Sequence, residues 1–156
     1  MPPVLRISVL VCLAVAACAP APEDIRDPWR ESIAALPAAK AGDAEGLQRT
    51  FAAARAQLMQ PYINGGEDAE TMFLNMGEVL RSTGDERFHQ VLLAEAPETR
   101  SAVRDFLSED DTRRDYPKTH ALLADAPEVE WPSDLAMKKS YQESGGTPPV
   151  KAPWKK

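Results

Sequence analysis

The chain has 156 residues, of which 44% are hydrophobic and 27% charged, and its formal net charge is −6 at pH 7. This length suffices for one domain of ordinary size and is too short for two domains with comfortable cores. An acidic body repels nucleic acid and anionic lipid, so neither is expected as a partner of the folded domain.

The first 17 residues have the pattern of a secretory signal peptide. Arg6 supplies a positive flank, residues 7–17 form an uncharged apolar run, and small residues precede Cys18. Such an arrangement is typical of a cleaved leader. A helix that crosses the hydrocarbon core needs about 20 apolar residues, so we do not expect this shorter run to remain as a membrane span.

The end of the leader also resembles a known processing site. Val15-Ala16-Ala17-Cys18 is similar to the lipobox of bacterial lipoproteins, in which an aliphatic residue and two small residues precede an obligatory cysteine. The resemblance covers residues 1–19 only. It implies cleavage before Cys18, a diacylglyceryl thioether on its sulfur and acylation of the new amino terminus. The alternative is an incidental cysteine at the end of an ordinary secretory leader.

The same resemblance implies a location. Ala19 after the cysteine favours the outer membrane of a bacterial envelope, with the domain facing the periplasm. Cys12 lies inside the leader and Cys18 at the anchor, so processing leaves no cysteine pair for an intramolecular disulfide. The domain must therefore be held together by its core alone.

A short tether and a first helix follow the anchor. Pro20 and Pro22 favour an extended spacer. Asp27-Pro28 predicts a helix start, with Asp as the N-cap and Pro in the first turn. We expect Pro37 to end or kink this helix, which is then short. Its apolar face is predicted to consist of Trp29, Ile33 and Leu36.

The clearest pattern is a pair of amphipathic helices. One begins after Gly42-Asp43 and stops near Gln60-Pro61; the other runs from Asp68 to Thr83-Gly84. Asn64-Gly65-Gly66 predicts a short turn between them, so the two should pack as an antiparallel hairpin. Their apolar stripes are Leu47, Phe51, Ala54 and Leu58 on the first helix, and Met72, Phe73, Met76 and Leu80 on the second.

Three further helices are predicted. One begins at Asp85, the next begins at Pro97 and ends at 108–111, and the last is capped by Ser133-Asp134 and ends at Gly145-Gly146. The last carries Leu135, Ala136 and Tyr141.

The sequence also contains one internal echo. LLAEAPE at 92–98 recurs as LLADAPE at 122–128, with Asp85 matching Asp115. A 30-residue period suits a two-helix unit. The pattern resembles a short array of helical hairpins of the tetratricopeptide or HEAT kind, without the consensus of either family. We therefore expect an all-α fold of about six or seven helices, either such an array or an irregular compact bundle.

The C-terminal residues differ in charge from the body. Residues 137–156 include five lysines, against Glu143 alone. With its prolines and Trp154, this segment predicts an extended basic tail. The tail is either a solvated terminus, which is favoured, or an element that docks on a partner or on anionic cell-wall polymer. The predicted parts are a signal peptide at 1–17, the lipidated cysteine and tether at 18–26, a helical domain at 27–143 and the tail at 144–156.

Patterns that support chemistry are scarce. The sequence has no His-Glu-x-x-His, no Gly-rich phosphate loop and no Gly-x-Ser-x-Gly elbow. His89 and His120 are offset by one position in the 30-residue register, and a metal site would need nearby carboxylates to join them. Glu109-Asp110-Asp111 lacks the spacing of a calcium loop and predicts a solvated turn. We assign no catalytic residue, metal ligand, cofactor or small-molecule substrate.

Two functions from different classes remain open. The favoured one is a non-enzymatic, membrane-anchored envelope lipoprotein that binds another envelope protein as an assembly or secretion accessory, scaffold or inhibitor. Met72, Met76 and Trp154 are its possible partner surface, although methionine at helical spacing more commonly fills a core. The alternative is a cell-envelope hydrolase with two carboxylates facing one pocket. A weaker idea is a carrier of lipid or another hydrophobic ligand in a cavity lined by Met72, Met76 and Phe51.

Overall fold

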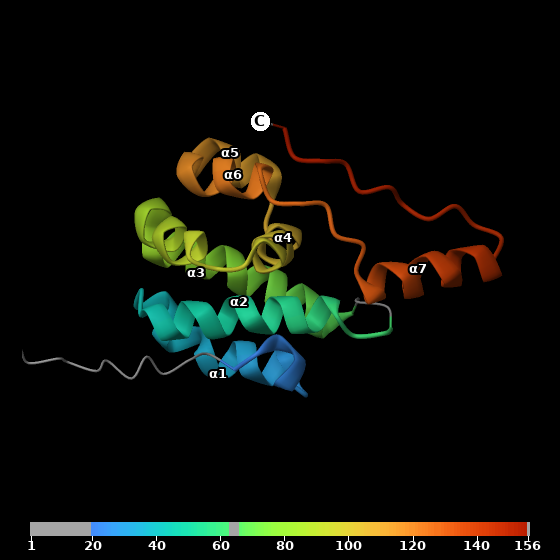
Figure 1. Ribbon diagram of the computed structural model, residues 1–156, viewed down its shortest axis with the longest axis horizontal. Coiled ribbons are helices and arrows are strands. Elements are labelled where there is room, and N and C mark those ends of the chain that lie inside the picture. Colours follow the sequence, from blue (N-terminus) through green and yellow to red (C-terminus); the bar gives the residue numbers. More distant parts are fainter. Residues whose placement is uncertain (1–19, 63–65, 156) are drawn as a thin grey trace, which may run out of the picture.

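The computed structural model describes residues 20–62 and 66–155, so the leader, Cys18 and the predicted turn at Asn64-Gly65 lie outside it. Within these ranges the chain forms seven α-helices and no strand (Figure 1). The predicted all-α class and the predicted number of helices are confirmed. A short 3-10 helix η1 (Pro22–Asp24) precedes α1 (Pro28–Lys40), α2 (Ala44–Leu58), α3 (Glu67–Leu93), α4 (Pro97–Asp105), α5 (Glu109–Asp115), α6 (Pro117–Ala124) and α7 (Pro132–Glu143).

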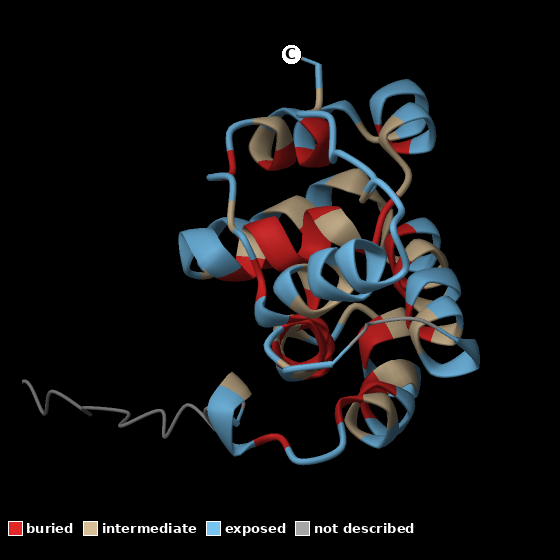
Figure 2. Ribbon diagram, turned by 90° about the vertical axis from the view of Figure 1, so that its right-hand side faces the viewer, coloured by how far each residue is buried: buried red, intermediate tan, exposed pale blue. Residues whose placement is uncertain are grey.

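Helix α2 lies at the centre of the molecule. It packs against α1, α3 and α4, and the buried positions in Figure 2 face this interior. The rings of Phe51 on α2 and Phe88 on α3 meet edge to face, with centroids 5.0 Å apart. Because several helices surround α2, the arrangement is a compact bundle, the second of the two predicted architectures, and not a linear array in which each unit contacts only its neighbours.

The central pair follows the predicted pattern closely. Asp43 caps α2 by accepting from the backbone N–H of Gly46 at 2.9 Å, and α2 and α3 run in opposite directions (Figure 1). Leu47, Phe51, Ala54 and Leu58 are all buried, as are Met72, Met76 and Leu80. Phe73 departs from the pattern, because its side chain is 41% exposed.

Helix α1 buries a face different from the predicted one. Trp29 and Leu36 pack partly against the core, but Ile33 is 40% exposed. A Cβ atom on Gly46 would lie 2.5 Å from the backbone nitrogen of Ala39, so α1 and α2 approach too closely for large side chains between them. The buried face of α1 therefore consists of Pro28 and the small residues Ser32, Ala35 and Ala39.

Of the two predicted effects of Pro37, an end or a kink of α1, the end is wrong, because the helix continues to Lys40. Proline lacks the N–H that the carbonyl of Ile33 would otherwise accept. Since Ile33 is exposed, that carbonyl can bond water instead, and the helix continues.

Gly84 divides α3 in the way that the sequence predicts. Its backbone has φ of +76° and ψ of 165°, a conformation that favours glycine, so the helix before it ends and a second segment starts at Asp85. The Nε–H group of Arg87 in that segment donates to the carbonyl of Gly42 at 2.8 Å. The start of the second segment is thereby tied to the turn between α1 and α2.

Two helix starts differ from the predictions. The acidic run 109–111 is the first turn of α5, not a solvated turn, because Ser108 caps it and the acidic residues complement the helix dipole. Helix α7 begins two residues earlier than predicted. Its N-cap is Trp131, whose backbone N–H donates to the carboxylate of Asp134 at 3.0 Å.

The internal echo is not a structural repeat. Leu92 and Leu123 are fully buried, whereas Leu93 is exposed and Leu122 only partly buried, so the two copies use different leucines for the core. Helix α4 starts at the proline of the first copy, while the second copy leads into the irregular segment 126–131. The matched motifs therefore share a helix end and little else.

Candidate functional site

A buried arginine positions one wall of the candidate site. Arg104 on α4 is 6% exposed, and its guanidinium donates to the carbonyls of Ala126 at 3.0 Å and Pro127 at 3.3 Å. It also lies 3.1 Å from the carboxylate of Glu128. These bonds satisfy carbonyls of the irregular segment between α6 and α7, and they hold that segment against α4.

Two carboxylates are fixed at the junction of α4 and α7. Asp105, the last residue of α4, accepts a hydrogen bond from Nε1 of Trp131 at 3.1 Å. Asp134, in the first turn of α7, accepts the backbone N–H of the same tryptophan. The side chains of Asp105 and Asp134 are only 15% and 13% exposed. One buried tryptophan therefore positions both carboxylates.

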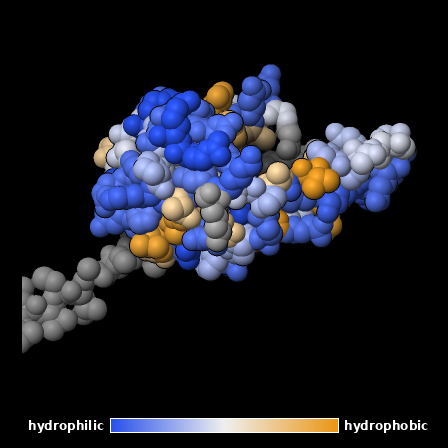
Figure 3. Space-filling model, turned by 90° about the horizontal axis from the view of Figure 1, so that it is seen from above, coloured by the Kyte–Doolittle hydropathy of each residue, from blue (hydrophilic) through white to orange (hydrophobic). Residues whose placement is uncertain are grey.

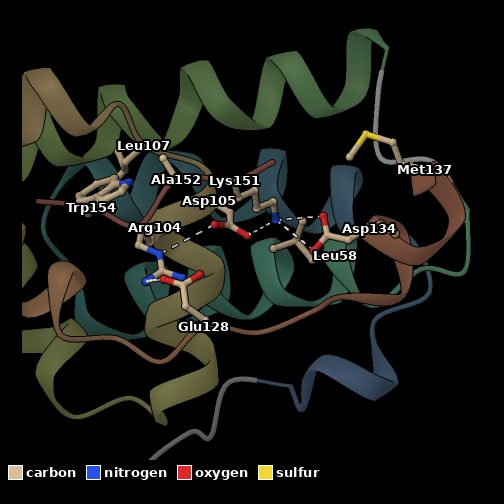
Figure 4. Close-up of a pocket in the computed structure, with 11 residues that line it drawn as sticks. Leu58, Arg104, Asp105, Leu107, Glu128, Asp134, Met137, Lys151, Ala152 and Trp154 are labelled. Carbon is tan, nitrogen blue, oxygen red and sulfur yellow. Dashed lines mark hydrogen bonds and ion pairs between the residues drawn. The ribbon is translucent and has the colours of Figure 1, made fainter. Parts of the chain in front are cut away.

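Lys151 of the C-terminal tail lies between these carboxylates (Figure 4). Its Nζ is 2.8 Å from Oδ2 of Asp105 and 2.9 Å from Oδ1 of Asp134. Burial alone would lower the pKa of Lys151, but the bonds to Asp105 and then to Asp134 outweigh it, and the pKa is raised. The ammonium group thus bridges two segments of the domain and holds the tail across them.

Further along the tail, Trp154 packs against α6. Its ring stacks on that of His120, with centroids 5.4 Å apart and planes 14° from parallel. Nε2 of His120 lies 2.8 Å from the carbonyl of Lys155, and because a carbonyl only accepts, this nitrogen carries the proton. The backbone N–H of Lys155 donates to Glu109 at 2.8 Å. Both backbone groups of Lys155 are therefore bonded to the domain.

A half-open hollow of about 410 Å³ lies between the tail and the domain. We call the surface that faces the tail the acidic groove. Its charged and aromatic contacts with the tail come from Asp105, Asp134, Glu109 and His120, and the hollow adds the apolar side chains of Leu58, Leu107 and Met137. The face of the molecule seen in Figure 3 is mostly hydrophilic, with scattered apolar patches.

The groove does not present an open acid/base pair. Asp105 and Asp134 converge, but the ammonium of Lys151 lies between them. Burial raises the pKa of Glu95, against a hydrogen bond with Gln48, but this carboxyl is not among the residues that line the hollow. Among residues 20–62 and 66–155 no group of three or more His, Cys, Asp or Glu side chains is placed to hold a metal ion.

The candidate residues predicted from the sequence lie in different environments in the structure. Cys18 lies outside the described residues. Met72 and Met76 are buried in the core, so they offer no surface to a partner in this structure. Trp154, predicted as part of a partner surface, stacks instead on the protein's own His120. His89 is absent from the groove contacts, whereas His120 forms two of them.

Sequence reasoning missed Arg104, Asp105, Asp134 and the role of Lys151. One signal pointed toward them, because the lysines of the tail are opposite in sign to the acidic body. That signal identifies no particular aspartate, since 24 acidic residues are distributed along the chain.

Comparison with family models, with curated proteins and with solved structures found no match for this chain. In the part of the chain that the structure describes, none of the helices combines the length and apolar character needed to cross a bilayer. The fold and the groove together define a small helical domain that holds an extended polypeptide segment on its surface.

Proposed function

We propose that the chain is a lipid-anchored protein of the bacterial envelope and acts there as a non-enzymatic protein-binding module. The anchor is the thiol of Cys18, on the strength of the lipobox resemblance. The binding role is supported above all by one observation: the acidic groove holds an extended segment through an ion pair, an aromatic stack and backbone hydrogen bonds. Extended peptides are commonly recognised by such combinations of contacts.

The tether gives the proposed anchor a short reach. Ile25 is buried against Ala52 and Ala56 of α2, so the chain joins the domain at this point. Between Cys18 and Ile25 a fully extended chain spans at most about 25 Å. A lipid at Cys18 would therefore keep the domain close to the membrane surface.

The two alternatives have less support. Acid/base hydrolysis needs one carboxyl that donates a proton and one carboxylate that accepts it, and Lys151 bridges the two carboxylates that converge. A hydrophobic-ligand carrier needs an enclosed apolar cavity. Phe51, Met72 and Met76, which would line such a cavity, are packed in the core.

Replacing Cys18 tests the anchor. In the producing bacterium, Cys18→Ser should abolish metabolic labelling of the protein with palmitate and release it from the membrane fraction or stall its processing. Cys12→Ser serves as the matched control and should leave labelling unchanged. Undiminished labelling of the Cys18→Ser variant would show that the lipid is not attached at this thiol.

A pull-down from envelope membranes with the lipidated full chain tests the binding role. We expect recovery of a specific envelope protein in stoichiometric amounts. Recovery of none, together with hydrolysis of cell-wall material by the purified chain, would favour the enzymatic alternative.

A further inference from the structure

The tail reaches the acidic groove by reversing the direction of the chain after α7 (Figure 1). Gly145, with φ of +74°, permits this turn. From Thr147 to Lys155 the tail has no regular secondary structure, and its polar contacts with the groove come from Lys151 and Lys155. Trp154 adds the ring contact with His120. The tail therefore contacts the groove through an ammonium group, an aromatic ring and backbone groups of an irregular segment, and not through the packed face of a helix.

We propose that the acidic groove is a recognition site for an extended segment of a partner protein, in which a lysine is followed three residues later by a tryptophan. The chain's own tail occupies this site as an intramolecular ligand. This assignment rests on the proposed protein-binding function and specifies the chemistry of its partner.

The groove is built without help from the tail. Trp131 fixes Asp105 and Asp134 through its indole N–H and its backbone N–H, and both bonds lie within the domain. His120 is largely buried on α6, and Glu109 begins α5. A preformed pair of carboxylates selects a cation, and the flat imidazole face selects an aromatic ring. Charge complementarity with the acidic groove therefore favours a basic and aromatic segment as the occupant.

The tail is also replaceable. The side chain of Lys151 remains 45% exposed and Val150 is 91% exposed. Partly exposed ion pairs each stabilise a contact only weakly. A short flexible connection gives the tail an effective concentration in the millimolar range, so a partner displaces it only when the partner's fit is good enough to overcome this competition.

The hollow beneath the tail indicates what a better fit involves. Ala152 lines this half-open hollow together with Leu58 and Leu107. A partner segment with a larger apolar residue directly after its lysine would bury more apolar surface there. We therefore expect the preferred segment to read lysine, large apolar residue, any residue, tryptophan.

The test uses the full chain with two substitutions in the tail, Lys151→Ala and Trp154→Ala, which release the tail and leave the groove intact. A fluorescein-labelled peptide with the sequence of residues 147–156 is titrated into this variant and into the unmodified chain, and anisotropy is recorded. The peptide should bind the released variant at least about tenfold more tightly, because the unmodified chain's own tail competes. A peptide with leucine at the place of Ala152 should bind more tightly still.

Two controls make the outcome decisive. The labelled peptide carrying Lys151→Ala and Trp154→Ala should not bind, and adding Asp105→Asn and Asp134→Asn to the released variant should weaken binding of the normal peptide at least tenfold. Equal binding to both chains, or no binding to a released variant whose helical circular dichroism is unchanged, would overturn the proposal. Dimerisation of the unmodified chain that Lys151→Ala abolishes would overturn it too, by making a second copy the occupant.

Failure of the proposed function is distinguishable from failure of this inference. Peptide binding is measured with purified components and requires neither the lipid nor an envelope partner. A bare thiol at Cys18 or an empty pull-down would thus leave the peptide result standing.

Discussion

Two aspartates that occupy matching places in the sequence echo have unrelated roles. Asp85, at the start of the second segment of α3, accepts the backbone N–H groups of Lys118 at 2.9 Å and Thr119 at 2.8 Å, and so caps α6 from another element. Asp115, its counterpart in the echo, lies at the end of α5 and pairs with its neighbour Arg114 on the surface. The two aspartates that match in the sequence echo therefore have different structural roles.

Replacing Asp85 by alanine should destabilise the protein by about 1 kcal/mol, the usual effect of losing a helix cap. Asp115→Ala is the matched control and should change the free energy of unfolding less, because an exposed ion pair contributes little. Urea denaturation followed by circular dichroism measures both. A larger loss for Asp115→Ala than for Asp85→Ala would contradict the assignment of the cap.

Asp85 also makes the free energy of unfolding depend on pH. Burial alone would raise the pKa of Asp85, but the bonds from Lys118 and Thr119 outweigh it, and the pKa is lowered. The stabilisation is therefore present above the unfolded pKa of about 3.9 and is lost as the pH falls through the folded value. The difference in unfolding free energy between the unmodified chain and Asp85→Asn should accordingly be full above about pH 5 and shrink at lower pH.

At the scale of elements, two glycines within helices have opposite structural roles. Gly46 on α2 lies against the backbone of α1, where an added Cβ would be 2.5 Å from the nitrogen of Ala39. Gly77 lies within α3, and an added Cβ there would meet nothing within 4 Å. The first is required by close packing, whereas the second only weakens its helix.

Gly46→Ala should therefore destabilise the protein by about 1–3 kcal/mol through overpacking, while Gly77→Ala should stabilise it by about 0.5–1 kcal/mol through helix propensity. Thermal denaturation of both variants provides the comparison. If Gly46→Ala were neutral or stabilising, α1 and α2 could not be as close as described.

The sequence predicts elements better where a periodic apolar stripe meets a clear cap. Helix α2 satisfies both conditions, with Asp43 at its start and Phe51 on its buried face. The face of α1 could not be predicted, because its alanines are selected by the approach of Gly46, a tertiary feature without a local signal. Helix α5 was missed because its acidic first turn has the composition of a loop, and only the Ser108 cap identifies it.

The candidate site was predictable only in part for a related reason. The sequence identifies Trp154 and the lysines of the tail as unusual, and their sign is opposite to that of the body. It does not predict that Trp131 brings Asp105 and Asp134 together, since these two aspartates are 29 positions apart and their meeting depends on how α7 returns to α4.

At the scale of the whole molecule, the tail contacts α7, α4 and α6 and so links these three helices. Replacing Asp105 and Asp134 by asparagine removes the charges that hold Lys151, so trypsin should cleave after Lys151 at least about fivefold faster. Glu130→Gln is the matched control. It also removes the charge of one carboxylate, but that carboxylate pairs with Lys138 on the surface and not with the tail, so the rate of cleavage should be unchanged. Mass spectrometry of a digestion time course identifies the bond cut. Equal rates in all three chains would show that these carboxylates do not retain the tail.

The docking of Ile25 on α2 also fixes an orientation. In both Figure 1 and Figure 2 the segment that carries η1 lies at one pole of the molecule and the C-terminal end of the tail at the other. If a lipid holds the chain at Cys18, the pole with η1 faces the bilayer and the tail points into the aqueous compartment. A ligand would then approach from the side opposite the membrane, as a soluble protein or a long projecting arm, without having to enter the narrow layer between domain and lipid.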